Sequence, residues 1–131
     1  MRKRRPKKGM RVTPRAFDGL VDRALASIPE RFGPYLENTV VVTEERPSRE
    51  ALARMAIGPG ESLYGMYEGT PLTERGAQEP LAPDRIVIYR GPLVEDFGDD
   101  ADRIAEQVRI TVLHEIGHHF GLDEDALENF E

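Results

Sequence analysis

The chain has 131 residues, no cysteine and a formal net charge of −6. This length suits one small domain with a single core, since two well-packed lobes need a longer chain. The lack of cysteine excludes disulfides and thiolate metal ligands, so a bound metal would need nitrogen and oxygen ligands. No apolar run approaches the roughly 20 residues that cross a bilayer, and no signal-peptide pattern follows the charged start. We therefore expect a cytoplasmic protein with no membrane partner.

The charge is unevenly distributed. Residues 1–15 contain eight Lys or Arg and no acid, whereas residues 16–131 contain ten basic residues and all 24 acidic ones. We expect residues 1–12 to be a disordered basic tail and residues 13–131 a single domain. The run at residues 2–8 allows a weak nucleic-acid contact through phosphate neutralisation, although no aromatic residues accompany it. The sequence leaves the oligomeric state open.

The first half of the domain predicts a helix, a strand and a second helix. Thr13 supplies an N-cap and Pro14 the first helical residue, and apolar residues then recur at helical spacing. The β-branched run at residues 39–43 predicts a buried strand. Ser48 then predicts the N-cap of a short helix through about Met55, and the Gly-Pro-Gly turn at residues 58–60 closes it.

Two further strands are expected at residues 63–67 and 85–89, joined by a loop or hairpin from residue 70 onward. The strand at 85–89 precedes the long helix of the second half, and we expect it to offer a free edge to which an extended peptide can pair. A short apolar turn around residues 93–97 follows it. The cleft of so small a chain should be shallow.

The long helix of the second half begins after Asp99 or Asp100, either of which can act as its N-cap. Gly121 is placed to end this helix, and a final short helix is expected at residues 123–130. Its expected apolar stripe comprises Ile104, Val108 and Val112, with Leu113 and Ile116 alongside.

All three histidines fall within six residues of this helix, in the pattern His-Glu-x-x-His. Since four residues make about 400° of helical rotation, His114 and His118 lie on one face, one turn apart, and can share a metal ion. Glu115 projects beside them, where a carboxylate can take a proton from water activated by the metal. The motif therefore predicts a zinc site with His114 and His118 as ligands and Glu115 as the catalytic residue.

His119 lies about 140° around the helix from His114, so it cannot join the same site without distortion. We predict a supporting or packing role for it, with its imidazole bonded to backbone or to a carboxylate. Tyr64, Tyr67 and Tyr89 are expected mainly to pack, although one of them can stabilise an oxyanion.

The chain resembles the minimal zincin-like metallopeptidase family of small bacterial proteins over roughly residues 14–130. The resemblance rests on the run from His114 to Glu124, on Pro83-Asp84-Arg85-Ile86, and on the run from Leu63 to Thr73. It implies an α+β fold, with a small mixed β-sheet packed on the active helix. It also implies a metallopeptidase whose substrate is not settled.

The third metal ligand is the open point of the motif. Long-motif zincins place it three residues after the glycine that here is Gly121, and this position is Glu124. Many long-motif relatives have His there and the small family often has Asp, so Glu is a departure, but zinc accepts a carboxylate oxygen. Asp123, Asp125 and an open or water-filled position are the alternatives.

Together these features predict hydrolysis of peptide or amide bonds by water that zinc activates, with Glu115 as general base. Two other functions remain open. One is a non-catalytic metal-binding or interaction module, in which zinc only stabilises the folded domain. The other is a zinc-dependent endoribonuclease, to which the basic tail would be suited. The metal itself can be lost or substituted by another divalent ion.

Overall fold

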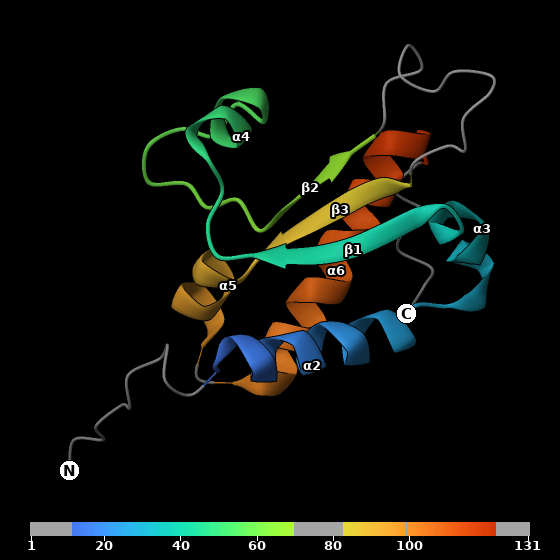
Figure 1. The fold of residues 1–131 in the computed structure, drawn as a ribbon, viewed down its shortest axis with the longest axis horizontal. Helices are drawn as coiled ribbons and strands as arrows, with labels where there is room; N and C mark the ends of the chain where they lie inside the picture. The colour runs from blue at the N-terminus through green and yellow to red at the C-terminus, as the bar shows by residue number, and fades with distance from the viewer. Residues whose placement is uncertain (1–11, 70–82, 99, 123–131) are drawn as a thin grey trace.

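The computed structural model describes residues 12–69, 83–98 and 100–122. Three strands form one mixed sheet in the order β1-β3-β2, in which β1 is parallel and β2 antiparallel to β3 (Figure 1). This is the α+β arrangement that the sequence predicted. The elements are α2 (Pro14–Ala26), η1 (Glu30–Phe32), α3 (Gly33–Leu36), β1 (Thr39–Glu44), α4 (Arg49–Arg54), β2 (Gly65–Glu68), β3 (Asp84–Tyr89), α5 (Arg90–Phe97) and α6 (Ala101–Phe120).

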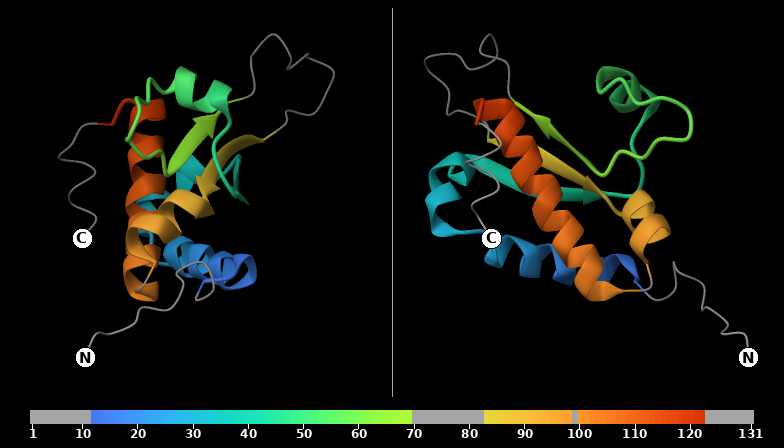
Figure 2. Two further views of the ribbon diagram at one scale, coloured as in Figure 1. Left: turned by 90° about the vertical axis from the view of Figure 1, so that its left-hand side faces the viewer. Right: turned by 180° about the vertical axis from the view of Figure 1, so that it is seen from behind.

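The sheet lies between unequal layers of helix. Figures 1 and 2 show α6 and α2 covering one face of the sheet, while α4 lies over part of the opposite face. The side chains of β3 explain this division, because successive residues of a strand point to opposite faces. Ile86 and Ile88 are fully buried in the cluster that includes Val108 of α6, whereas Val87 and Tyr89 pack in a second cluster with residues of α4.

Helix α6 carries the predicted motif, and its ends are fixed by the predicted residues. The side chain of Asp100 accepts the N–H of Arg103 at 3.2 Å, and Gly121 ends the helix in the left-handed conformation at φ 69°. The expected apolar stripe from Ile104 to Ile116 is buried, which anchors the helix on the sheet. Within the described ranges, no helix is long and apolar enough to cross a membrane.

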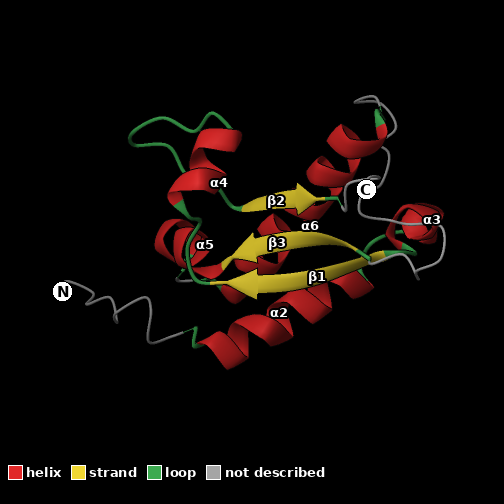
Figure 3. Ribbon diagram, turned by 45° about the horizontal axis from the view of Figure 1, so that its top comes forward, coloured by secondary structure: helices red, strands yellow, loops and turns green. Residues whose placement is uncertain are grey.

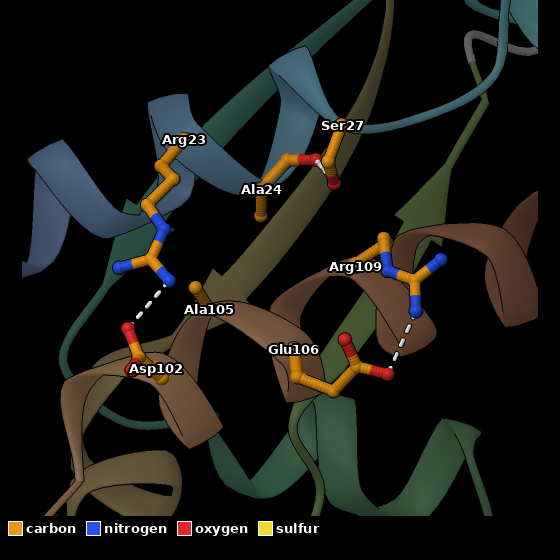
Figure 4. Close-up of a pocket in the computed structure, with 7 residues that line it drawn as sticks. All are labelled: Arg23, Ala24, Ser27, Asp102, Ala105, Glu106 and Arg109. Carbon is orange, nitrogen blue, oxygen red and sulfur yellow. Dashed lines mark hydrogen bonds and ion pairs between the residues drawn. The ribbon is translucent and has the colours of Figure 1, made fainter. Parts of the chain in front are cut away.

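Charged side chains connect α2 with the first half of α6. Arg23 of α2 pairs with Asp102 at 2.6 Å, and Arg109 of α6 pairs with Glu106 at 2.7 Å (Figure 4). These four side chains line a pocket of about 260 Å³ between the two helices. Thr13 caps α2 as predicted, and its hydroxyl oxygen accepts the N–H of Ala16.

Two predictions about the strands are wrong. The strand expected at residues 39–43 to be buried is the partly exposed edge strand β1, with 42% of Val40 exposed. The strand before the motif helix, β3, is the central strand and therefore offers no free edge; as Figure 3 shows, the edge strands are β1 and β2. A short apolar run does not by itself distinguish a central strand from an edge strand.

One helix also differs from expectation. The apolar turn expected near residues 93–97 is the helix α5, in which Pro92 lies in the first turn, where a missing N–H is tolerated. The N–H of Gly91 donates to the carbonyl oxygen of Glu45 at 2.8 Å, and an added Cβ would lie only 2.7 Å from that oxygen. Helix α4 agrees with expectation: it has the predicted Ser48 cap and ends at Arg54 with Met55 as its C-cap, before Ala56, which has a φ of 57°.

The folded core already includes Val12, which is 5% exposed and whose carbonyl oxygen accepts a hydrogen bond from Arg90. The remaining predicted elements lie outside the described residues. These are the basic tail through residue 11, the connection at residues 70–82, the alternative cap Asp99 and the last helix at residues 123–130.

Candidate active site

Helix α6 places the two predicted ligands side by side. The imidazole rings of His114 and His118 have centroids 4.8 Å apart and are inclined by 79° to each other. Both side chains are exposed, although the helix is otherwise buried through this stretch. Two imidazoles one helical turn apart offer the nitrogen donors that zinc prefers, so these residues fit a shared metal ion.

Glu115 lies beside them but is directed inward. The residue is 9% exposed, and its Oε1 accepts the backbone N–H of Tyr67 in β2 at 2.9 Å. Burial raises the pKa of the Glu115 carboxyl above its ordinary value of 4.5; the bond from Tyr67 and the charges of His118 and His114 oppose this rise. A base with a raised pKa accepts a proton more readily near neutral pH.

A pocket of about 430 Å³ opens next to His114 and Glu115. Its walls come from α6, from the start of β2 and from the segment that precedes β2. Most of the lining surface is apolar, and the lining comprises Ile57, Ser62, Leu63, Tyr64, Gly65, Gln107, Ile110 and Thr111 besides the two motif residues. Ile110 lies one turn before His114 on the same face of the helix and is 36% exposed.

The close approach of β2 to α6 requires a glycine. A Cβ added to Gly65 would lie 2.6 Å from Cγ2 of Thr111 and 2.9 Å from the carbonyl oxygen of Val87. Both distances are too short for non-bonded atoms. Gly65 therefore sets the distance between β2 and α6, and with it the position of the strand that holds Glu115.

The tyrosine hydroxyls near the site are bonded to carboxylates. The hydroxyl of Tyr64 donates to Oδ2 of Asp96 at 2.5 Å, and burial together with this bond raises the pKa of Tyr64 to about 12. The hydroxyl of Tyr67 donates to Oδ2 of Asp84 at 2.7 Å. An oxyanion role for one of these tyrosines stays a prediction.

The third histidine packs against the sheet. The ring of His119 stacks on the ring of Tyr67, with centroids 3.9 Å apart and an angle of 14° between the planes. This agrees with the packing role predicted from its position on the helix. No sequence signal marks the Tyr67 N–H that holds Glu115, because a backbone donor has no characteristic residue type. Ile110 had a signal that was overlooked: an apolar residue one turn before the first ligand.

The predicted third ligand lies beyond the described residues, as do its alternatives Asp123 and Asp125. Over residues 12–69, 83–98 and 100–122, no group of three His, Asp or Glu side chains is arranged to hold a metal. The described part of the site thus consists of two imidazoles and one buried carboxylate. Glu124 stays a prediction.

A small mixed sheet packed on a His-Glu-x-x-His helix defines the class of zincin-like proteins. The model of the zincin-like metallopeptidase family matches residues 36–131, and the chain belongs to this family. Among solved structures, the chain is similar to a conserved hypothetical protein from Thermo thermophilus, with 28% identity and a TM-score of 0.55. That match covers 83% of this chain and 94% of the other. No curated protein matches the chain significantly.

Proposed function

We propose that this protein is a zinc-dependent peptidase that hydrolyses peptide or amide bonds, with Glu115 as the general base. One observation carries the proposal: a buried carboxylate lies beside two exposed imidazoles and, together with His114, lines a pocket with a largely apolar surface. Membership in a metallopeptidase family supports the same chemistry.

His114 and His118 would hold the metal, and we propose Glu124 as the third ligand. Bound zinc supplies Lewis acidity, which polarises a carbonyl group and lowers the pKa of water. Two histidines and one carboxylate are a usual ligand set for catalytic zinc. The residues present therefore fit the ion that the family implies.

Glu115 would move the proton during hydrolysis. The Tyr67 N–H fixes its Oε1, and the second carboxylate oxygen would accept a proton from the attacking water. The same oxygen would then deliver this proton to the nitrogen of the leaving amine as the peptide bond breaks. The raised pKa of the Glu115 carboxyl favours both transfers near neutral pH.

The substrate would be an extended peptide. Within the described sheet, β2 is an edge strand beside the site, and its outward backbone groups other than the Tyr67 N–H, which holds Glu115, would bind a peptide through hydrogen bonds. The neighbouring pocket, with Ile57, Leu63 and Ile110 in its wall, would receive an apolar side chain next to the scissile bond. We therefore expect preference for an apolar residue such as leucine at that position.

Metal removal and restoration test the proposal. A library of internally quenched peptides is incubated with the zinc-loaded protein, with protein treated with EDTA, and with treated protein to which zinc is returned. We expect cleavage in the first sample, none in the second and recovery in the third. Zinc-loaded protein that cleaves no member of the library, or cleavage that persists without metal, would contradict the proposal.

A further inference from the structure

The side chain of Tyr67 is held from two directions. His119 of α6 stacks on its ring at 3.9 Å between centroids, and its hydroxyl donates to Asp84, the first residue of β3, at 2.7 Å. The backbone N–H of the same residue donates to Glu115. One residue thus connects the third histidine of the motif with the carboxylate proposed to act as the base.

The strand that carries this N–H is short. β2 has four residues and lies at an edge of the described sheet. In an antiparallel pair, alternate residues direct their N–H groups toward the partner strand. The N–H of Tyr89 donates to the carbonyl oxygen of Tyr64, which places Met66 and Glu68 among the residues bonded to β3. The N–H of Tyr67 is directed away from β3, where it reaches Glu115.

We propose that His119 is a positioning residue, whose stacking on Tyr67 fixes the backbone of β2 so that the Tyr67 N–H stays on Oε1 of Glu115. Short edge strands open locally more easily than central ones. The stack of His119 on Tyr67 counters this opening. Because His119 and Glu115 both belong to α6, the stack holds β2 to the helix that carries the carboxylate. Only the catalytic consequence of this inference rests on the proposed function, because the hydrogen bond exists without substrate.

Amide hydrogen exchange followed by NMR tests the inference directly, on metal-free protein. The comparison is between the wild type, His119→Ala, which removes the ring, and His119→Phe, which keeps a ring that can stack. In His119→Ala we expect the amides of Tyr67, Met66 and Glu68 to exchange about tenfold faster, because opening of β2 exposes the whole strand, while the amides of β1 change little. His119→Phe should restore slow exchange. An unchanged Tyr67 amide in His119→Ala would overturn the inference.

Kinetics on the same quenched peptides provide the second test. His119→Ala should lower kcat about tenfold with little change in KM, the size usual for residues that orient a catalytic group, and His119→Phe should recover most of it. In a Tyr67→Leu background, His119→Ala should have no further effect, because its action passes through Tyr67. Fully additive losses would contradict this route. A wild type without activity would refute the proposed function, while the exchange result would still decide the inference.

Discussion

Two pockets lie beside the active helix, and their charged groups differ in surroundings. Between α2 and α6, Arg23 pairs with Asp102 and Arg109 with Glu106, so acids and guanidinium groups neutralise one another (Figure 4). In the pocket at the motif, Glu115 is buried and its carboxylate is held by a backbone N–H. The same helix therefore carries one carboxylate whose pKa is raised by burial and others that face guanidinium groups at the surface.

This difference distinguishes charged groups that form surface ion pairs from a carboxylate that is suited to catalysis. Ion pairs at the surface contribute little to stability. A buried carboxylate with a raised pKa costs stability, and such groups cluster where a protein needs a proton acceptor. The pocket at Glu115 is accordingly the candidate active site, and the pocket between α2 and α6 is a packing feature. Five substitutions, in four experiments, test this distinction.

The strongest change is expected in activity. Glu115→Gln should lower kcat by about 10²–10⁴-fold, because an amide cannot accept the proton, while zinc stays bound. The matched control is Glu106→Gln, on the same helix but in the other pocket, which should retain nearly full activity. Cleavage of the quenched peptides and metal content measure both variants. Equal effects of the two substitutions would remove the distinction between the pockets.

The next largest effect is expected in stability, at Gly65, where β2 lies close to α6. Gly65→Ala places a Cβ 2.6 Å from Thr111 and should destabilise the protein by about 1–3 kcal/mol, as overpacking does. The control Gly19→Ala lies in the exposed face of α2 with no atom near the added Cβ, and should stabilise by about 0.5–1 kcal/mol. Urea denaturation measures both values. A neutral Gly65→Ala would show that β2 does not need this close contact.

The raised pKa of Glu115 predicts a pH-dependent stability difference. Because the folded state binds this proton more tightly than the unfolded state, the wild type loses stability as pH rises through the folded-state pKa. Glu115→Gln cannot lose stability in this way. Thermal unfolding of metal-free protein between about pH 4 and 8 should therefore show that the stability of the variant, relative to that of the wild type, increases as the pH rises. A difference that is constant, or that shrinks, would show that the pKa of Glu115 is not raised in the folded state.

The weakest effect is expected at the ion pair between α2 and α6. The side chains of Arg23 and Asp102 are 53% and 81% exposed, so Arg23→Ala should cost only about 0.2–1 kcal/mol and leave cleavage unchanged. Denaturation and the peptide assay check this prediction. A loss of activity without a loss of stability would show that the second pocket is more than a packing feature.

Local chemistry explains which parts of the fold could be predicted. Thr13, Ser48 and Asp100 cap helices because their side-chain oxygens accept nearby N–H groups, and Gly121 adopts a positive φ that other residues avoid. The histidine pair follows from helical periodicity alone. These features depend on a few neighbouring residues, so they can be predicted from the sequence.

The features that were missed depend on contacts between distant segments. Whether β3 is central depends on which strands pair with it, and its apolar run is compatible with either position. The hydrogen bond from Tyr67 to Glu115 joins residues 48 positions apart. The apolar turn expected around residues 93–97 is instead part of α5, which accommodates Pro92 in its first turn. Tertiary packing decides each of these cases.

Every catalytic step proposed for this protein depends on a metal site at His114 and His118, and zinc titration decides whether that site exists. Zinc binding to the metal-free protein is measured by competition with a chromogenic chelator for the wild type, for His114→Ala, and for His119→Ala as the matched histidine control. We expect one zinc per chain in the wild type and in His119→Ala. In His114→Ala, which loses a ligand, we expect zinc affinity to fall by roughly a hundredfold or more. A wild type that binds no zinc, or a His114→Ala variant that binds it equally well, would show that the histidine pair is not a metal site.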